Sequence, residues 1–133
     1  MTWMLDTNIA IQIIRSKPPQ LLARLTAHAV GEVLISSISA AELWFGVAKS
    51  REVQQNARAL EQFLMPLEVA PFDERAASAY GPLRAELERQ GRPIGPLDTL
   101  IAAHALSLGA TLVTSNVQEF ARVPGLRIED WVS

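Results

Sequence analysis

Short apolar segments alternate along the chain with longer stretches in which apolar residues recur at helical spacing. Helical patterns fill the intervals between the short segments, most clearly between residues 52 and 64. Strands that alternate with helices favour an α/β fold with a largely parallel sheet. The strand-like runs are Trp3–Leu5, Val33–Ile35, Leu67–Phe72, Thr111–Val113 and Leu126–Ile128.

Residues typical of helix ends mark several of the predicted boundaries. Pro96 suits the first position of a helix that stops before Gly109, a favoured residue just past a helix end. Asp73 is expected to cap the long helix that follows it. Ser39 and Glu42 have the spacing of a capping box, so the side chain of Glu42 would reach back to the backbone amide of Ser39.

Composition narrows the class of protein. A length of 133 residues with 49% apolar residues predicts one folded domain over residues 1–133. The chain has no cysteine, which excludes disulfides and thiolate metal sites. With neither a leader nor an apolar run of about 18 residues, we expect a cytoplasmic protein that does not enter a membrane. The net charge of −2 does not by itself indicate a nucleic-acid-binding protein.

Four acidic residues occupy similar places in the predicted pattern. Asp6, Glu42 and Glu119 follow short apolar strands directly or within one helical turn, and Asp98 begins a helix after a Gly-Pro pair. Each has a purely structural explanation, because acids cap helices and are favoured in their first turn. If the strands are parallel neighbours, however, their carboxyl ends share one edge of the sheet, and the four acids could converge there.

Carboxylates that converge repel one another unless protons or a cation offset their charge. Mg²⁺ and Mn²⁺ prefer oxygen ligands and retain water molecules for chemistry. The two histidines, His28 and His104, lack the paired spacing of a zinc site, and we interpret both as structural or surface residues. Phosphate-binding loops, dinucleotide fingerprints, nucleophile elbows and zincin motifs are absent from the sequence.

Four motifs, taken in order, resemble those of PIN-domain ribonucleases, in particular the VapC toxins of bacterial type II toxin–antitoxin systems. The resemblance spans nearly the full chain and implies a PIN-like three-layer α/β/α sandwich, with a central, largely parallel sheet of four to five short strands. A tail from Val123 to Trp131 is also typical of this group. The motifs are Met4-Leu5-Asp6-Thr7-Asn8, Ser39-Ala40-Ala41-Glu42-Leu43 with Gly46, Pro96-Leu97-Asp98-Thr99-Leu100-Ile101-Ala102, and Leu112-Val113-Thr114-Ser115-Asn116 with Glu119-Phe120.

The resemblance places the family's acidic cluster on Asp6, Glu42 and Asp98. Glu119 matches a fourth acid whose position varies in the family, whereas Val117 cannot bind a metal. The four acids are thus the expected catalytic and metal-binding residues, with Mg²⁺ as cofactor and Mn²⁺ as its substitute. They would hold one ion, or two ions roughly 3.5–4 Å apart. The expected supporting residues are Thr7, Asn8, Thr114 and Asn116.

The activity implied by the resemblance is that of a toxin that hydrolyses RNA phosphodiester bonds as a metal-dependent endoribonuclease. Family members cut transfer RNA or ribosomal RNA, and the sequence does not decide between these substrates. The implied partners are a VapB-type antitoxin, which covers the active site with a C-terminal segment, and a second copy of the chain. Cations on the rim of the site would contact the RNA backbone, and the candidates are Arg15, Lys17, Lys49 and Arg51.

Two alternatives remain open from the sequence. The chain could be an antitoxin-binding PIN module with weak or lost nuclease activity, using the apolar stripe of Val53, Ala57, Leu60 and Leu64 with Trp44 and Phe45. Core packing is the more usual role of such an apolar stripe. A phosphatase or receiver-like pocket is the other alternative, but the Asp6-Thr7-Asn8 segment lacks a second aspartate and no lysine follows a late strand.

Overall fold

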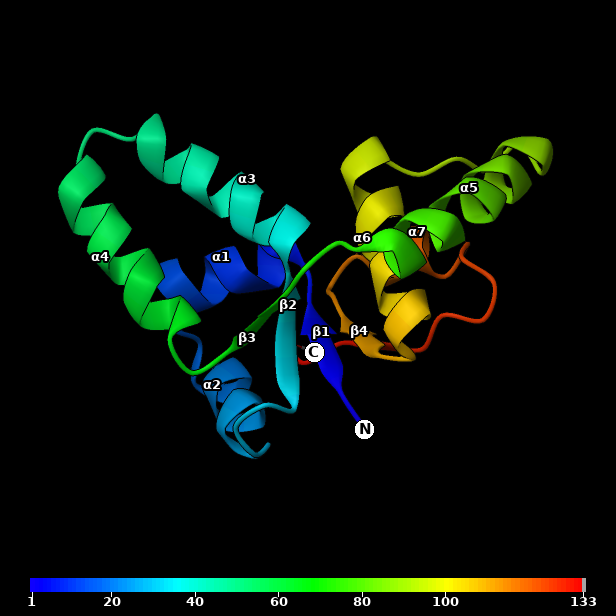
Figure 1. Ribbon diagram of the computed structural model, residues 1–133. Helices are drawn as coiled ribbons and strands as arrows, with labels where there is room; N and C mark the ends of the chain where they lie inside the picture. The colour runs from blue at the N-terminus through cyan, green and yellow to red at the C-terminus, as the bar shows by residue number, and fades with distance from the viewer. Residues whose placement is uncertain (133) are drawn as a thin grey trace.

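A five-stranded parallel sheet forms the centre of the molecule (Figure 1). The computed structural model describes residues 1–132, and Ser133, the last residue of the predicted domain, lies outside them. The strands run in the order β3-β2-β1-β4-β5, and every neighbouring pair is parallel. Their bounds are β1 (Trp3–Leu5), β2 (Val33–Ser36), β3 (Glu68–Ala70), β4 (Thr111–Val113) and β5 (Ile128–Glu129).

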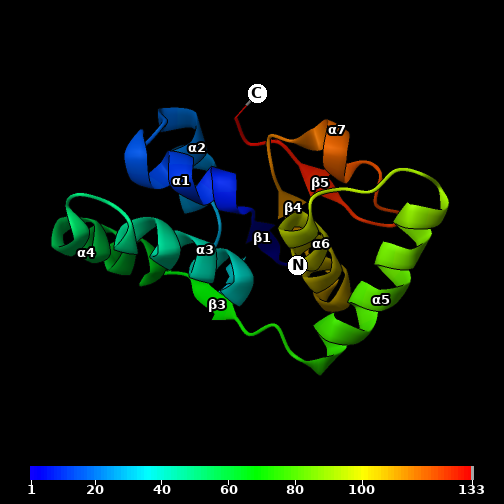
Figure 2. The ribbon, with the colours of Figure 1, turned by 90° about the horizontal axis from the view of Figure 1, so that it is seen from above.

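Helices cover both faces of the sheet, which confirms the predicted three-layer α/β/α arrangement. Figures 1 and 2 show α1 to α4 gathered on one side of the molecule and α5 to α7 on the other. None of the helices within residues 1–132 is both long and apolar enough to cross a membrane. Their bounds are α1 (Thr7–Arg15), α2 (Pro19–Thr26), α3 (Ser37–Ala48), α4 (Val53–Leu64), α5 (Glu74–Arg89), α6 (Pro96–Leu108) and α7 (Val117–Phe120).

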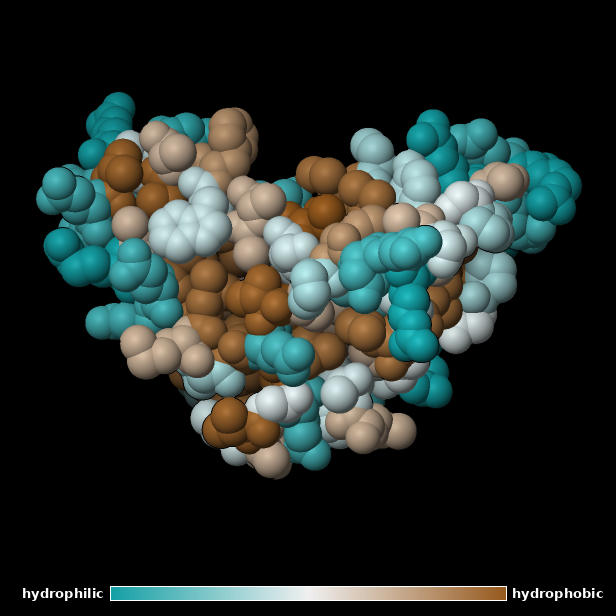
Figure 3. Space-filling model, in the orientation of Figure 1, coloured by the Kyte–Doolittle hydropathy of each residue, from teal (hydrophilic) through white to brown (hydrophobic). Residues whose placement is uncertain are grey.

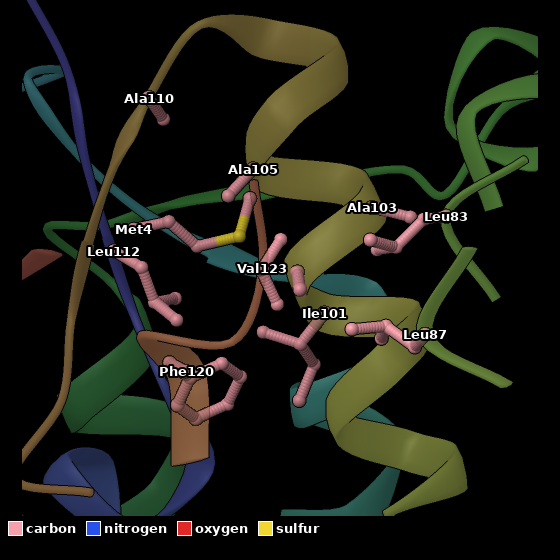
Figure 4. Packing of buried hydrophobic residues seen from close by; sticks show 11 residues of the cluster. Met4, Leu83, Leu87, Ile101, Ala103, Ala105, Ala110, Leu112, Phe120 and Val123 are labelled. Carbon is pink, nitrogen blue, oxygen red and sulfur yellow. The ribbon is translucent and has the colours of Figure 1, made fainter. Parts of the chain in front are cut away.

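Alternation of side chains along the central strands divides the core between the two faces. Met4 and Leu112 are fully buried on the face covered by α6, where they pack with Ile101 (Figure 4). Their chain neighbours Leu5 and Val113 belong to the opposite cluster, which contains buried residues of α1 and α2. Strands buried on both faces have continuous apolar sequences rather than alternating ones, as these strands do.

The chain reverses its direction of travel across the sheet between β1 and β4. From β1 it passes outward to β2 and β3, and it then returns to β4 and continues to β5 on the other side. Ligands in open α/β folds bind beyond the carboxyl ends of the strands at such a switch point. The hollow between the two groups of helices in Figure 3 opens above this edge of the sheet. Asp6 follows β1 directly, and Thr114 follows β4.

The capping box predicted at Ser39 and Glu42 is wrong. The helix begins one turn earlier, because Ser36 is its N-cap and accepts a hydrogen bond from the amide of Ile38 at 3.0 Å. Ser39 is therefore a buried residue inside α3, and Glu42 lies in the second turn. Ser36, like Ser39, belongs to the residue types that favour N-caps, and the sequence pattern selected the wrong one.

The apolar stripe of α4 mainly packs into the core. Leu60 is buried and clusters with Ile35 and Leu43, and Leu64 packs against the same cluster. Val53, at the start of the helix, is 42% exposed.

Both histidines have structural surroundings. His104 is buried and its Nδ1 lies 2.8 Å from Ser36 Oγ. The ring of His28 lies between those of Trp3 and Trp131, with centroid separations of 3.9 and 5.3 Å. Neither histidine contacts any of the four acids through a hydrogen bond or ring contact within residues 1–132, in agreement with the sequence-based interpretation.

Burial in this core predicts the effect of shortening Leu112. The substitution Leu112→Ala removes a fully buried side chain from a central strand, which should lower the free energy of unfolding by about 3 kcal/mol. Leu108→Ala is the matched control, since Leu108 is 42% exposed at the end of α6 and its truncation should cost less than about 1 kcal/mol. Urea denaturation measures both values, and equal losses would contradict the assigned core.

Candidate active site

Asp6 combines a structural role with a place at the carboxyl edge of the sheet. Its carboxylate accepts a hydrogen bond from the amide of Ile9 at 2.8 Å and so caps α1. Its own amide donates to the carbonyl of Val113 at 3.0 Å, which joins the ends of β1 and β4. The hydroxyl of Thr114 donates a further hydrogen bond to the carboxylate. Only 3% of Asp6 is exposed, and the two hydrogen bonds to its carboxylate hold the side chain in one position.

Glu42 is connected to the Asp6 segment through Thr7. The Thr7 hydroxyl donates to Glu42 Oε1 at 2.7 Å and lies 2.9 Å from the hydroxyl of Ser39. A hydroxyl has one proton and two lone pairs, so Thr7 can donate to Glu42 while it accepts from Ser39. Thr7, in the first turn of α1, therefore orients the side chain of Glu42 on α3.

Asp98 and Glu119 approach one another around Gly95. Asp98 lies in the first turn of α6, and Gly95 is the N-cap residue of that helix. The amide of Gly95 donates to Glu119 Oε1 at 3.0 Å, while Asn116 donates to Glu119 Oε2. A Cβ atom at Gly95 would be in van der Waals contact with Asp98 Oδ2, at 3.5 Å, and with Glu119 Oε1, at 3.8 Å. The absence of a side chain at Gly95 thus leaves space beside both carboxylates.

The four carboxylates influence one another electrostatically. The pKa of Asp98 is raised to about 6, mainly by burial and further by the charge and hydrogen bond of Glu119 and the charges of Asp6 and Glu42. Burial also raises the pKa of Asp6, against the hydrogen bonds from Thr114 and Ile9, and the charge of Glu42 adds to the shift. A hydrogen bond between two carboxyl groups requires that they share a proton. The cluster is therefore under a repulsion that a proton or a cation would relieve.

The structure brings all four predicted acids to one edge of the sheet, together with three of the predicted supporting residues. Thr7 orients Glu42, Thr114 orients Asp6, and Asn116 orients Glu119. Asn8, the other predicted supporting residue, is exposed and has no side-chain hydrogen bond within the described part of the chain. No group of three or more acidic or histidine side chains in residues 1–132 is already arranged as a metal cage.

Two further residues of this site, Ser39 and Gly95, were not predicted as functional. Ser39 shares the Thr7 hydroxyl with Glu42. The three-residue spacing between Ser39 and Glu42 places them on one helix face, and this spacing signals their shared partner once the helix start is known. Gly95 could have been recognised from the Gly-Pro pair that precedes Asp98 by two residues.

A groove of about 190 Å³ extends from the acidic cluster along α3, between α1 and α4. Glu42 lines both the groove and the cluster. Arg15 and Lys49, two of the predicted rim cations, line this groove, and the ammonium group of Lys49 lies 4.9 Å from the ring centre of Phe45. Lys17 and Arg51 do not line it. The apolar lining residues are Ile11, Ile14, Leu43, Val47 and Leu60.

A family model described as the PIN domain matches residues 3–126, which include all four acids. The chain belongs to the PIN-domain family. Within this family it belongs with VapC proteins, because it is 45% identical over 131 residues to a protein of Shigella flexneri named tRNA(fMet)-specific endonuclease VapC. The alignment covers 98% of both chains. A protein named ribonuclease VapC2 of Haemophilus influenzae is 42% identical, with 99% of each chain covered.

Solved PIN-domain structures share the same fold. A crystal structure of DNA-bound VapBC from Salmonella typhimurium contains a chain with a TM-score of 0.95 and 44% identity, and 98% of each chain is covered. A chain of VapBC2 from Rickettsia felis, bound to a DNA fragment from its promoter, has a TM-score of 0.93 and 42% identity. That match covers 98% of this chain and 99% of the other. These similarities confirm the predicted fold class.

The raised pKa of Asp98 predicts that Asp98→Asn stabilises the metal-free PIN domain at alkaline pH. Because its folded pKa of about 6 exceeds the reference value of 3.8, the folded chain binds more protons than the unfolded chain between these pH values. Stability therefore falls as the pH rises through this range and stays lower above it. At pH 8 without metal, the variant should melt a few degrees higher than the parent, and the difference should vanish towards pH 4.

Thermal melts of the metal-free protein between pH 4 and pH 8 test this expectation. Glu52→Gln is a suitable control, because Glu52 is exposed and makes no side-chain cap bond at the start of α4. This control should show no comparable pH-dependent difference. An Asp98→Asn variant that melts below the parent at pH 8 would contradict the repulsion described above.

Proposed function

We propose that the chain is the toxin of a type II toxin–antitoxin pair and that it hydrolyses RNA phosphodiester bonds with the help of Mg²⁺ or Mn²⁺. The observation that carries the proposal is the convergence of Asp6, Glu42, Asp98 and Glu119 on one rim, where three of them raise the pKa of the fourth. VapC relatives named as ribonucleases support the reaction class. Transfer RNA is the first substrate to test, because two relatives are named tRNA(fMet)-specific endonucleases.

The residues present suit a hard divalent cation. Carboxylate oxygens are the ligands that Mg²⁺ and Mn²⁺ prefer, and a cation would offset both the burial and the repulsion that raise the pKa of Asp98. Asp6 and Asp98 would hold the ion, directly or through water, and Glu42 and Glu119 would complete the acidic shell. When bound, such an ion offsets the charge of the carboxylates against a polyanionic substrate and activates water as the nucleophile.

The surrounding polar residues keep the carboxylates in position for this task. Thr114 and the Ile9 amide fix Asp6, and the Thr7 hydroxyl fixes one oxygen of Glu42. Both oxygens of Glu119 already accept hydrogen bonds, one from Gly95 and one from Asn116. Each carboxylate oxygen retains a second lone pair, so Glu119 can still contribute to an ion or to its water shell.

The expected partner is a VapB-type antitoxin bound in the groove along α3. The groove is lined mainly by apolar side chains, and Glu42 connects it to the acidic cluster, so an occupying segment would also obstruct the active site. Structures similar to this chain come from VapBC complexes of Rickettsia felis, Salmonella typhimurium and Haemophilus influenzae. An amphipathic segment in an apolar groove is a common form of peptide recognition.

Three further parts of the proposal concern the whole chain. Residues 1–133 would form a single PIN domain, since helices on both faces share one sheet. The domain would act in the cytoplasm, where its RNA substrate lies. It would also form a homodimer and a toxin–antitoxin hetero-oligomer, and the exposed side chains of Trp44 and Phe45, 39% and 65% accessible, are suited to a protein interface.

Replacement of one acid should remove RNA cleavage without unfolding the protein. Asp98→Asn retains the size of the side chain but withdraws a charged ligand, so we expect at least about a hundredfold slower cleavage of transfer RNA in Mg²⁺. Asp73→Asn is the matched control, because Asp73 caps α5 and asparagine caps a helix equally well. Gel analysis of end-labelled RNA measures both rates. A folded Asp98→Asn protein with undiminished metal-dependent cleavage would rule out the assignment.

Filling the groove should weaken antitoxin binding. Gly46 lines the groove, and a Cβ atom there would meet nothing within 4 Å. Gly46→Leu should therefore leave the fold intact, since leucine also favours helix formation, while the affinity for the antitoxin falls about tenfold or more. Gly81→Leu is the control: Gly81 lies within α5 and has equally open surroundings. Calorimetry with the antitoxin encoded beside this chain gives both affinities, and equal values would locate the antitoxin elsewhere.

A further inference from the structure

An RNA strand cannot be held by an acidic site alone, so the cations beside the acidic cluster are of particular interest. Several arginines are already engaged by carboxylates: Arg24 with Glu129, Arg84 with Glu88, and Arg89 with Glu86. The side chains of Arg15 and Lys49 belong to the groove along α3 and lie near the far ends of α1 and α3. Arg122 forms no ion pair with residues 1–132.

Arg122 is attached to the same loop that supports Asp98 and Glu119. Its Nη1 donates to the carbonyl of Pro93 at 3.0 Å, and two residues further on the amide of Gly95 donates to Glu119 at 3.0 Å. Two residues of chain span at most about 7 Å. The guanidinium therefore lies close to the acidic cluster, on the side formed by α7. Figure 2 shows the connection between α5 and α6 passing beside α7.

The chemistry of this arginine suits a phosphate group. The bond to Pro93 uses one of the five N–H donors of the guanidinium and restricts its orientation. The remaining donors are at a partly exposed position and can form a bidentate contact with phosphate oxygens. An arginine that is already oriented loses less conformational entropy on binding than a free one.

We propose that Arg122 binds a backbone phosphate of the RNA substrate next to the phosphate at the acidic cluster, and so positions the strand for cleavage. The inference rests on the proposed ribonuclease function for the identity of the ligand. Its basis is the place of the guanidinium, since it shares the loop of residues 93–95 with two of the four acids. A contact to the backbone orients the strand without reading its sequence.

Equilibrium binding of a labelled single-stranded RNA of mixed sequence tests the proposal. Ca²⁺, which also takes oxygen ligands, replaces Mg²⁺, and fluorescence anisotropy is recorded between 50 and 200 mM salt. Arg122→Gln should weaken binding about three- to tenfold, and the slope of log affinity against log salt should decrease by about 0.7, as expected for one lost phosphate contact to a single strand. Arg122→Lys should retain most of the slope because it keeps the charge.

Arg127→Gln is the matched control. Arg127 also donates to a backbone carbonyl, that of Gly109, but this bond lies at the start of β4, at the opposite edge of the sheet from Asp6. The substitution removes the same charge and a similar anchoring bond. Because Arg127 lies away from the acidic cluster, its loss should leave the RNA affinity and the salt slope unchanged. Equal losses for Arg122→Gln and Arg127→Gln would overturn the proposal and indicate a general effect of charge.

A merely structural role of Arg122 predicts a different result. If its bond to Pro93 only supported the loop, Arg122→Gln would weaken Mg²⁺ binding in calorimetry and lower the melting temperature while the salt slope stayed the same, and the proposal would be wrong. A cleavage assay of the unsubstituted chain in Mg²⁺ distinguishes a failure of the proposed ribonuclease function from a failure of the inference about Arg122. Binding that depends on Arg122 without any cleavage would contradict the ribonuclease function alone, whereas cleavage with unchanged Arg122→Gln binding would contradict this inference alone.

Discussion

Repulsion among four carboxylates at one edge of the sheet is the constraint on which the rest of this site depends. Like charges in a partly buried place destabilise the fold unless something offsets them. Burial, the charge and hydrogen bond of Glu119, and the charges of Asp6 and Glu42 together raise the pKa of Asp98 to about 6, which reflects this cost. The parallel sheet and the helix starts around it hold the acids together in spite of the repulsion, and a cation of the right chemistry would convert that cost into binding free energy.

The scaffold supplies hydrogen-bond donors to three of the four carboxylates of this cluster. Asp6 is held by the start of α1 and by Thr114 at the end of β4, and Glu42 by Thr7 from the neighbouring helix. Glu119 receives donors from Asn116 and from the loop before α6. Each of these three carboxylates is therefore oriented by residues close to a strand end or a helix start. Such support on rigid elements is what a precise metal site requires.

The sequence was informative where local chemistry determines structure. Apolar runs and turn residues located every strand, although β5 is shorter than predicted and begins at Ile128. Asp6 was recognised both as a helix cap and as a candidate ligand, and the structure shows that it caps α1 at the edge where the four acids converge. Local patterns failed at Glu42, because Ser36 and Ser39 both suit an N-cap, and Ser36, where β2 ends, is the residue that caps α3. The hydrogen bond between Gly95 and Glu119 joins residues 24 positions apart, and no local pattern could have predicted it.

Proton release on Mg²⁺ binding tests the central claim most directly. Calorimetric titrations at pH 6 and pH 8, each in two buffers of different ionisation enthalpy, give the number of protons displaced by the ion. Because the pKa of Asp98 is about 6, binding should release a substantial fraction of one proton at pH 6 and almost none at pH 8. Binding without pH-dependent proton release, or no binding at either pH, would contradict the account.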